Sequence, residues 1–180
     1  MRRERGFSLI EVMVAMLVLS VGLLSLVGVM SMGLKTVGSS SYQLLAREKA
    51  REAVESVHAA RDTGRLSWPN IRNVADGGIF LAGAQNLKQP GVDGIVNTSD
   101  DSSADYEQLR KPGPDGLLGT ADDEVMPLIN FTREVKIDTL NYANTTNVNP
   151  NLRQITVTVR YLVDGRWRSY TMTTYISSFS

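Results

Sequence analysis

The sequence predicts an α+β protein in which one long N-terminal helix packs on a small antiparallel β-sheet. An uncharged apolar segment near the N-terminus runs into a stretch with helical periodicity, so the helix would be apolar in its first half and amphipathic in its second. Near the C-terminus, two runs of alternating apolar and polar residues flank an Asp-Gly pair, the favoured sequence of a two-residue hairpin turn. The 180 residues suit one such helix and one compact domain.

The first element is long enough to cross a membrane. Residues 12–34 contain no charge and no proline, and as a helix they would reach about 35 Å, against about 30 Å for a hydrocarbon core. Arg2, Arg3 and Arg5 precede the segment and are expected to stay cytoplasmic, which places the rest of the chain outside. A cleaved secretory signal would be shorter, and a buried core helix rarely lacks charge on every face for so long. A plain membrane anchor is the main alternative to a more specific role.

Glu11 argues against a plain anchor. An acidic residue at the start of an apolar helix is unfavourable, by up to about 3 kcal/mol at mid-bilayer and by less near the edge. No basic residue follows it before Lys35. A partner for its carboxylate therefore has to come from another molecule or from a newly formed N-terminus.

Residues 6–12 resemble the cleavage and methylation motif of type IV prepilins and type II secretion pseudopilins. They read GFSLIEV and stand between the basic residues MRRER and the apolar segment. The resemblance implies that prepilin peptidase, a membrane aspartic peptidase, cuts after Gly6 and methylates the new terminal amine of Phe7. It also implies that Glu11, fifth in the mature chain, pairs with the terminal amine of a neighbouring subunit. Within this family, the apolar segment is most similar to those of type IV pilus minor pilins.

The resemblance also implies an organisation and a role for the chain. Residues 1–6 would be a leader peptide, residues 7–38 a transmembrane and polymerisation helix, and residues 39–180 a globular pilin-like head. The protein would span the inner membrane once with its head in the periplasm, and would then join a pilus filament at the cell surface through other pilins. The implied function is that of a structural minor pilin incorporated into, or priming, a type IV pilus. A type II secretion pseudopilin shares the same N-terminus and stays open as the alternative.

Four glycines, at positions 22, 28, 33 and 38, punctuate the N-terminal helix. Glycine costs about 1 kcal/mol relative to alanine inside a helix, so these positions are candidate points at which the helix could stretch. Small residues equally allow close packing between helices, and the sequence leaves both interpretations open.

The head begins with the amphipathic part of the helix, which is expected to end at about residue 61. Its apolar stripe requires a sheet to cover it, and loops are expected over residues 62–127. Strands are predicted at residues 128–137, at residues 155–163 and from residue 166 to about residue 176, with Asp164-Gly165 as the turn between the last two. Pairing across that turn places Val159 opposite Tyr170 and Val157 opposite Met172. The stripe comprises Ala46, Ala50, Ala53, Val54, Val57 and Ala60.

The middle of the chain holds an internal repeat. The first repeat, residues 90–101, reads PGVDGIVNTSDD, and the second repeat, residues 112–123, reads PGPDGLLGTADD. They share seven of twelve residues, namely the proline, two glycines, the threonine and three aspartates. No basic residue lies within either repeat, so the clustered carboxylates would repel one another without a cation.

Calcium is the cation that this pattern favours, because it takes six to eight oxygen ligands and glycines let a short loop wrap around it. The pattern is similar to oxygen-rich calcium loops of secreted bacterial proteins, including the Gly-Asp loop of major pseudopilins, and differs from an EF-hand. The alternative is a pair of ordinary turns, since Asp and Gly are common turn residues. Whether the two repeats share one ion is open. The candidate ligands are Asp93, Asp100, Asp101, Asp115, Asp122 and Asp123.

Composition and motifs argue against other function classes. The net charge is zero and the chain beyond its first six residues is mildly acidic, so nucleic-acid binding is not expected. Cysteine is absent, which excludes disulfides, thiolate zinc sites and thiol nucleophiles. Without a nucleophile elbow, a phosphate-binding glycine loop or a His-x-x-x-His pair, the chain is not expected to be an enzyme. A head that acts as a calcium-dependent adhesin on the filament is the alternative from a different class.

Overall fold

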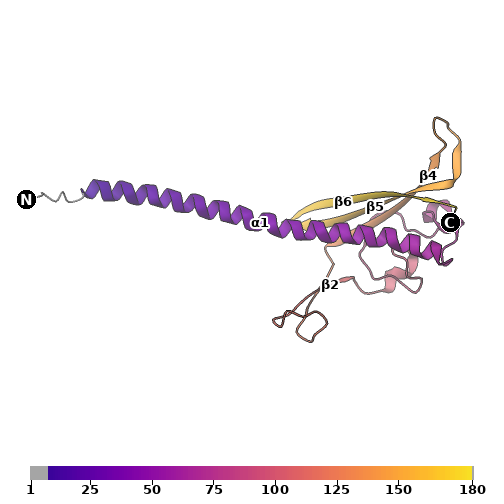
Figure 1. Ribbon diagram of the computed structural model, residues 1–180, viewed down its shortest axis with the longest axis horizontal. Helices are drawn as coiled ribbons and strands as arrows, with labels where there is room; N and C mark the ends of the chain where they lie inside the picture. The colour runs from indigo at the N-terminus through magenta and orange to yellow at the C-terminus, as the bar shows by residue number, and fades with distance from the viewer. Residues whose placement is uncertain (1–7, 180) are drawn as a thin grey trace, which may run out of the picture. The chain divides into compact units, whose positions relative to one another are not determined.

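The computed structural model describes residues 8–179, except for the side chains of residues 34–39 and 102–103 (Figure 1). Gly6 and Phe7, the predicted processing residues, lie outside this range. The chain divides into two compact units, Met1–Ser41 and Tyr42–Ser180. The long N-terminal helix α1, Leu9–Asp62, contributes residues to both.

In the first unit, α1 is an apolar helix whose side chains from residue 8 to residue 33 are all exposed. Leu9–Gly33 forms a 25-residue stretch with a mean hydropathy of 2.6, long and apolar enough to cross a membrane. The helix passes through Gly22, Gly28 and Gly33 without a break, and a Cβ atom at each of them would meet open space. The predicted apolar helix is confirmed, and the role of its glycines stays a prediction.

In the second unit, α1 turns a face of small side chains toward the interior. Small residues at helical spacing let a helix and a sheet approach closely. The predicted stripe is confirmed with one difference, since Val54 is only partly buried at its margin. The fully buried members are Ala46, Ala50, Ala53, Val57 and Ala60.

The end of α1 is formed by a glycine cap close to the predicted position. Gly64 has a φ of +71°, a conformation that glycine adopts without strain. The backbone N–H of Leu66 donates to the carbonyl oxygen of Ala60 at 2.9 Å, which satisfies one of the last helical carbonyls.

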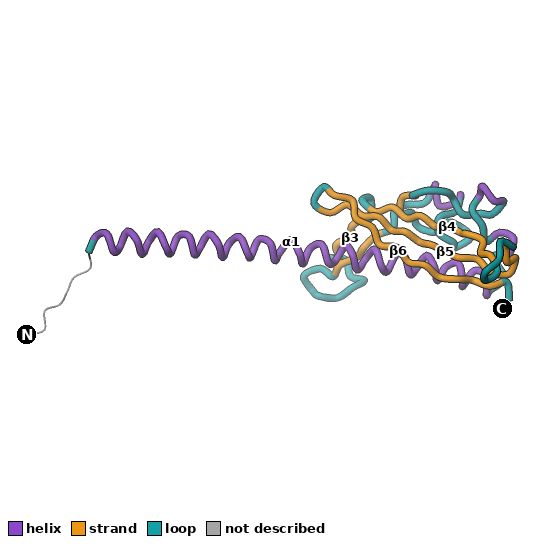
Figure 2. The backbone as a smooth tube through the Cα atoms, turned by 90° about the horizontal axis from the view of Figure 1, so that it is seen from above, coloured by secondary structure: helices purple, strands orange, loops and turns teal. Residues whose placement is uncertain are grey.

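The sheet that covers α1 has four antiparallel strands in the order β1-β4-β5-β6. In both views, the ribbons of β4, β5 and β6 run alongside the C-terminal half of α1 (Figures 1 and 2). The strands are β1, Gln85–Asn86, β4, Phe131–Asn141, β5, Val148–Val163, and β6, Arg166–Ser177.

The hairpin between β5 and β6 has the predicted turn and register. Asp164 and Gly165 both have positive φ angles, +51° and +70°, as a two-residue turn of type I′ requires. Val159 pairs with Tyr170 and Val157 pairs with Met172, as the alternating pattern predicts. Every second side chain of β5 from Arg153 to Val163 is buried, and this face forms the core with α1.

Three strand boundaries and one region differ from the prediction. β4 ends at Asn141 instead of residue 137, and β5 begins at Val148 instead of residue 155. β4 begins at Phe131 instead of residue 128, because Ile129 and Asn130 form a turn in which the N–H of Phe131 donates to the carbonyl oxygen of Leu128 at 3.2 Å. Residues 62–127 were expected to be loops, yet they contain three short 3-10 helices, strand β1 and a separate two-stranded ribbon of β2, Gln108–Lys111, and β3, Glu124–Pro127. Such short elements carry too few residues for a visible period.

Candidate functional site

The first candidate site is the start of α1, where Glu11 lies in the first helical turn. The backbone N–H of Glu11 donates to the carbonyl oxygen of Ser8 at 3.0 Å, a hydrogen bond that closes the first turn of the helix. A carboxylate in the first turn of a helix is favoured by the helix dipole. That interaction offsets only part of the unfavourable transfer of the carboxylate into an apolar layer.

Glu11 is exposed, and its carboxylate makes no ion pair with any residue of the described range. The same face of α1 continues with Ala15 and Leu19, which are both apolar. The geometry therefore presents one acidic group beside an apolar surface, which is suited to a cationic partner from outside the described chain. Pairing of Glu11 with a neighbouring subunit stays a prediction.

The second candidate site is the pair of acidic repeats, and both fold into the same hydrogen-bonded loop. In the first repeat, Asp93 accepts a hydrogen bond at 2.7 Å from the N–H of Ile95, and Asp100 accepts one at 3.2 Å from the N–H of Asp93. Asp101 accepts a bond at 2.6 Å from the N–H of Asn97. Carboxylates thus satisfy the donors of a tight turn from inside the loop.

The second repeat makes the same bonds with the equivalent residues. Asp115 accepts from the N–H of Leu117 at 2.8 Å, and Asp122 accepts from the N–H of Asp115 at 3.2 Å. Asp123 accepts from the N–H of Gly119 at 2.7 Å. The internal repeat found in the sequence is therefore also a repeat of structure.

A threonine at the same position of each repeat binds one of the aspartates through its hydroxyl group. The hydroxyl of Thr98 lies 2.5 Å from Asp100, and the hydroxyl of Thr120 lies 2.6 Å from Asp122. These hydrogen bonds lower the pKa of both aspartates below the ordinary value. The hydroxyl groups therefore favour the ionised form of both carboxylates.

Asp101 differs from the other aspartates of the repeats because it lies in the interior. Burial raises the pKa of Asp101, while the backbone N–H groups of Gly91, Thr98 and Asn97 act in the opposite direction. The positive charge of Arg133 also acts to lower the pKa of Asp101. Asp101 is thus held mainly by donors of its own loop.

The structure brings the six predicted calcium ligands into two separate loops. Within residues 8–179, no three acidic or histidine side chains are grouped in a way that could hold a metal ion. The backbone bonds described above account for the clustered carboxylates as loop-forming groups. Calcium binding stays a prediction, with Asp93, Asp100, Asp101, Asp115, Asp122 and Asp123 as its candidate residues.

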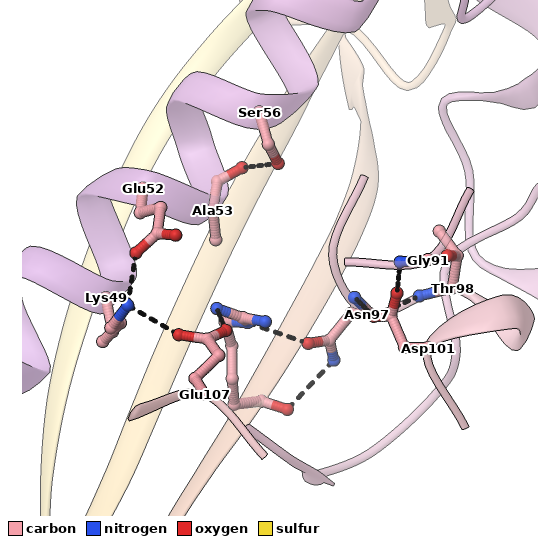
Figure 3. A network of polar contacts seen from close by, with 10 residues as sticks. Lys49, Glu52, Ala53, Ser56, Gly91, Asn97, Thr98, Asp101 and Glu107 are labelled. Atoms are coloured by element: carbon pink, nitrogen blue, oxygen red, sulfur yellow. Dashed lines mark hydrogen bonds and ion pairs between the residues drawn. The ribbon is translucent and has the colours of Figure 1, made fainter. Parts of the chain in front are cut away.

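A buried polar network beside the first repeat was missed by the sequence analysis (Figure 3). Glu107 forms ion pairs with Lys49 of α1 at 2.7 Å and with Arg133 of β4 at 3.0 Å. Arg133 in turn donates from Nε to the side-chain oxygen of Asn97 at 3.0 Å, and the Asn97 amide donates to the Arg133 carbonyl oxygen at 3.0 Å. Helix, sheet and first repeat are thereby joined by a single chain of contacts.

The signal for this network was present in the alternation of β4. Arg133 occupies an inward position between the buried residues Phe131 and Val135, and its side chain is 1% exposed. A charge at a core position needs a charged partner and further hydrogen bonds. Glu107 supplies that charge. Although burial opposes it, pairing with Glu107 and Glu52 leaves the pKa of Lys49 raised.

Comparison with known proteins addresses the first site. A family model described as the prokaryotic N-terminal methylation motif matches residues 1–27. No curated protein and no solved structure gives a significant match. The matched range includes the basic leader, Gly6, Phe7, Glu11 and most of the apolar helix. The N-terminus of this chain is therefore a prokaryotic N-terminal methylation motif, the motif typical of type IV pilins and pseudopilins.

Proposed function

We propose that this chain is a structural minor pilin-like subunit, processed by prepilin peptidase and assembled into, or priming, a type IV pilus. The observation that carries the proposal is Glu11, an acidic group in the first turn of an apolar helix with no partner among the described residues. Glu11 stands within a methylation motif, and in this proposal its cationic partner is the amine that forms when residues 1–6 are removed.

Processing and assembly depend on each other in this proposal. Cleavage after Gly6 creates the terminal amine at Phe7, and this amine of one subunit meets Glu11 of its neighbour. Pairing the two charges in an apolar layer offsets the unfavourable burial of each, whereas either charge alone would disfavour the packed state. Before assembly the subunit would sit in the inner membrane through Leu9–Gly33, a stretch of suitable length and hydropathy.

The proposal is tested with the full-length protein in cells that assemble the filament. We expect mass spectrometry of the native protein to find an N-terminus at a methylated Phe7. A Gly6→Val variant is expected to stay at precursor mass. A mature protein that retains residues 1–6 would contradict the processing step.

Assembly is tested separately with Glu11→Ala. Removing one partner of a buried ion pair typically costs about 3–5 kcal/mol, so we expect incorporation into sheared filaments to fall more than about tenfold while cleavage continues. The matched control is Glu48→Ala, an exposed glutamate further along the same helix, which should assemble normally. Normal assembly of the Glu11→Ala variant would contradict the proposed pairing.

A type II secretion pseudopilin is the alternative within the same class, since the motif and the apolar helix serve both systems. The two are separated by the phenotype of cells that lack the chain. Loss of surface pili with normal protein secretion supports the pilus, and the reverse result supports the secretion system. A calcium-dependent adhesin would instead lose binding to its target when calcium is chelated, with filaments intact.

A further inference from the structure

The second repeat differs from the first in what surrounds its two central apolar residues. In the first repeat, Ile95 and Val96 are 2% and 1% exposed and belong to the core. The equivalent residues of the second repeat, Leu117 and Leu118, are 63% and 65% exposed. The same type of loop thus buries its apolar pair in the first repeat and exposes it to solvent in the second.

We propose that the second repeat is a docking loop that inserts Leu117 and Leu118 into an apolar pocket of a different protein, beside a cationic side chain. The first repeat already shows this mode of packing, because its loop places the equivalent residues, Ile95 and Val96, in an apolar interior. Ile95 and Val96 occupy that interior site in every copy of this chain, so a second copy cannot accept Leu117 and Leu118 there.

The position of the second repeat suits a docking role. It connects β2 to β3, and this ribbon pairs only with itself among the described strands. Leu109 at the base of the ribbon packs against the core, which anchors it. Figure 1 shows the ribbon and its loop standing away from the four-stranded sheet. The tip of the ribbon is therefore accessible, whereas its base is held.

The loop is also ordered before any partner arrives. Asp115, Asp122 and Asp123 fasten its backbone with hydrogen bonds of 2.8, 3.2 and 2.7 Å. Thr120 binds Asp122 at 2.6 Å. Because the binding shape exists in the free chain, association does not have to order the loop, and exposed leucines on a rigid turn can act as anchors.

The charge of the partner follows from one oxygen of Asp123. In the first repeat, the equivalent oxygen, Oδ1 of Asp101, accepts the N–H of Gly91 at 3.0 Å. In the second repeat, Oδ1 of Asp123 is buried and has no hydrogen-bond partner among the described residues. This oxygen needs a donor, and a lysine or arginine at the rim of the pocket would supply one together with a charge that complements the carboxylate.

The test is photo-crosslinking in the full-length protein, in the cells that produce it. p-Benzoylphenylalanine replaces Leu117, and in a control it replaces Val92, which is fully exposed in the first repeat. We expect one discrete protein adduct from position 117 and none from position 92. The crosslinked peptide should map to an apolar pocket that has a lysine or arginine at its rim.

A second variant separates docking from accidental proximity. The photoreactive residue is moved to Val125 on β3, in the natural sequence and in a Leu117→Ser, Leu118→Ser variant. We expect the adduct to fall at least about tenfold in the variant, because truncating anchor residues typically changes affinity by more than this factor. The melting temperature should not change, since both leucines are exposed.

Several outcomes would overturn the inference. They are the absence of an adduct at position 117, an adduct with lipid only, an adduct with another copy of this chain, and a yield that does not depend on the two leucines. Because the readout is the adduct and not filament assembly, its failure is distinguishable from failure of the proposed pilin function.

Discussion

The first and second repeats share seven of twelve residues and three equivalent backbone-to-aspartate hydrogen bonds, yet one is part of the core and the other is exposed. Five of the twelve positions differ, and the contacts of one of them are clear in the structure. Asn97 reaches β4 with both ends of its amide, through bonds of 3.0 Å to Arg133, while Gly119 has no side chain that could do so. Local sequence determines the shape of the loop, whereas long-range contacts such as those of Asn97 hold the first repeat against the rest of the fold.

The largest expected contrast concerns the central apolar pair. Ile95→Ala removes buried methyl groups from the core, and we expect it to lower the free energy of unfolding by about 2–5 kcal/mol. The equivalent change Leu117→Ala is expected to stay within about 0.5 kcal/mol, because its side chain is 63% exposed. Chemical denaturation of the full chain in detergent, followed by near-UV circular dichroism, measures both. Equal losses would show that the second repeat is also buried in solution.

The next contrast concerns calcium binding by the two repeats. Each repeat contains three of the six candidate carboxylates. If the predicted site exists, calcium at a hundredfold excess over its dissociation constant should stabilise the folded chain by about 2.7 kcal/mol. We expect Asp122→Asn to reduce this effect more than Asp100→Asn, since the second repeat is the more accessible of the two. Calorimetry and thermal unfolding with and without chelator measure it. No heat and no shift would show that the carboxylates serve the loops alone.

The smallest expected effect comes from exchanging the residues that distinguish the repeats. Asn97→Gly leaves the Nε of buried Arg133 without its acceptor, and an unsatisfied buried donor costs about 1–3 kcal/mol. The reciprocal Gly119→Asn change adds an exposed amide at a φ of +90° and should alter stability by less than about 1 kcal/mol. Both are measured by urea unfolding. Similar effects would show that Asn97 does not hold the first repeat in place.

Much of the fold could be predicted because it depends on patterns among residues that are close in the sequence. The apolar helix, the stripe of small residues from Ala46 to Ala60, and the Asp164-Gly165 turn each have a period or a turn signature that needs no tertiary context. The register of β5 and β6 follows from the turn, since a two-residue hairpin leaves only one way to keep both apolar faces on the same side.

The middle of the chain could not be predicted in the same way. β1 has two residues, and β2 and β3 have four each, too few to show alternation. The interior position of Arg133 depends on Glu107, which is 26 residues away in the sequence and adjacent only after folding. The clustered aspartates indicated a cation, and the structure adds backbone N–H groups as partners that no side-chain pattern reveals.

By itself, the sequence determined that the chain has a methylation motif, an apolar helix with an acidic residue in its first turn, a hairpin, and two repeats of one loop. These features depend on neighbouring residues, so their physical cause is local. Only the tertiary structure decided that the first repeat is buried and the second exposed. That outcome depends on which contacts the rest of the fold offers to each loop, and the backbone bonds that the two loops share cannot specify it.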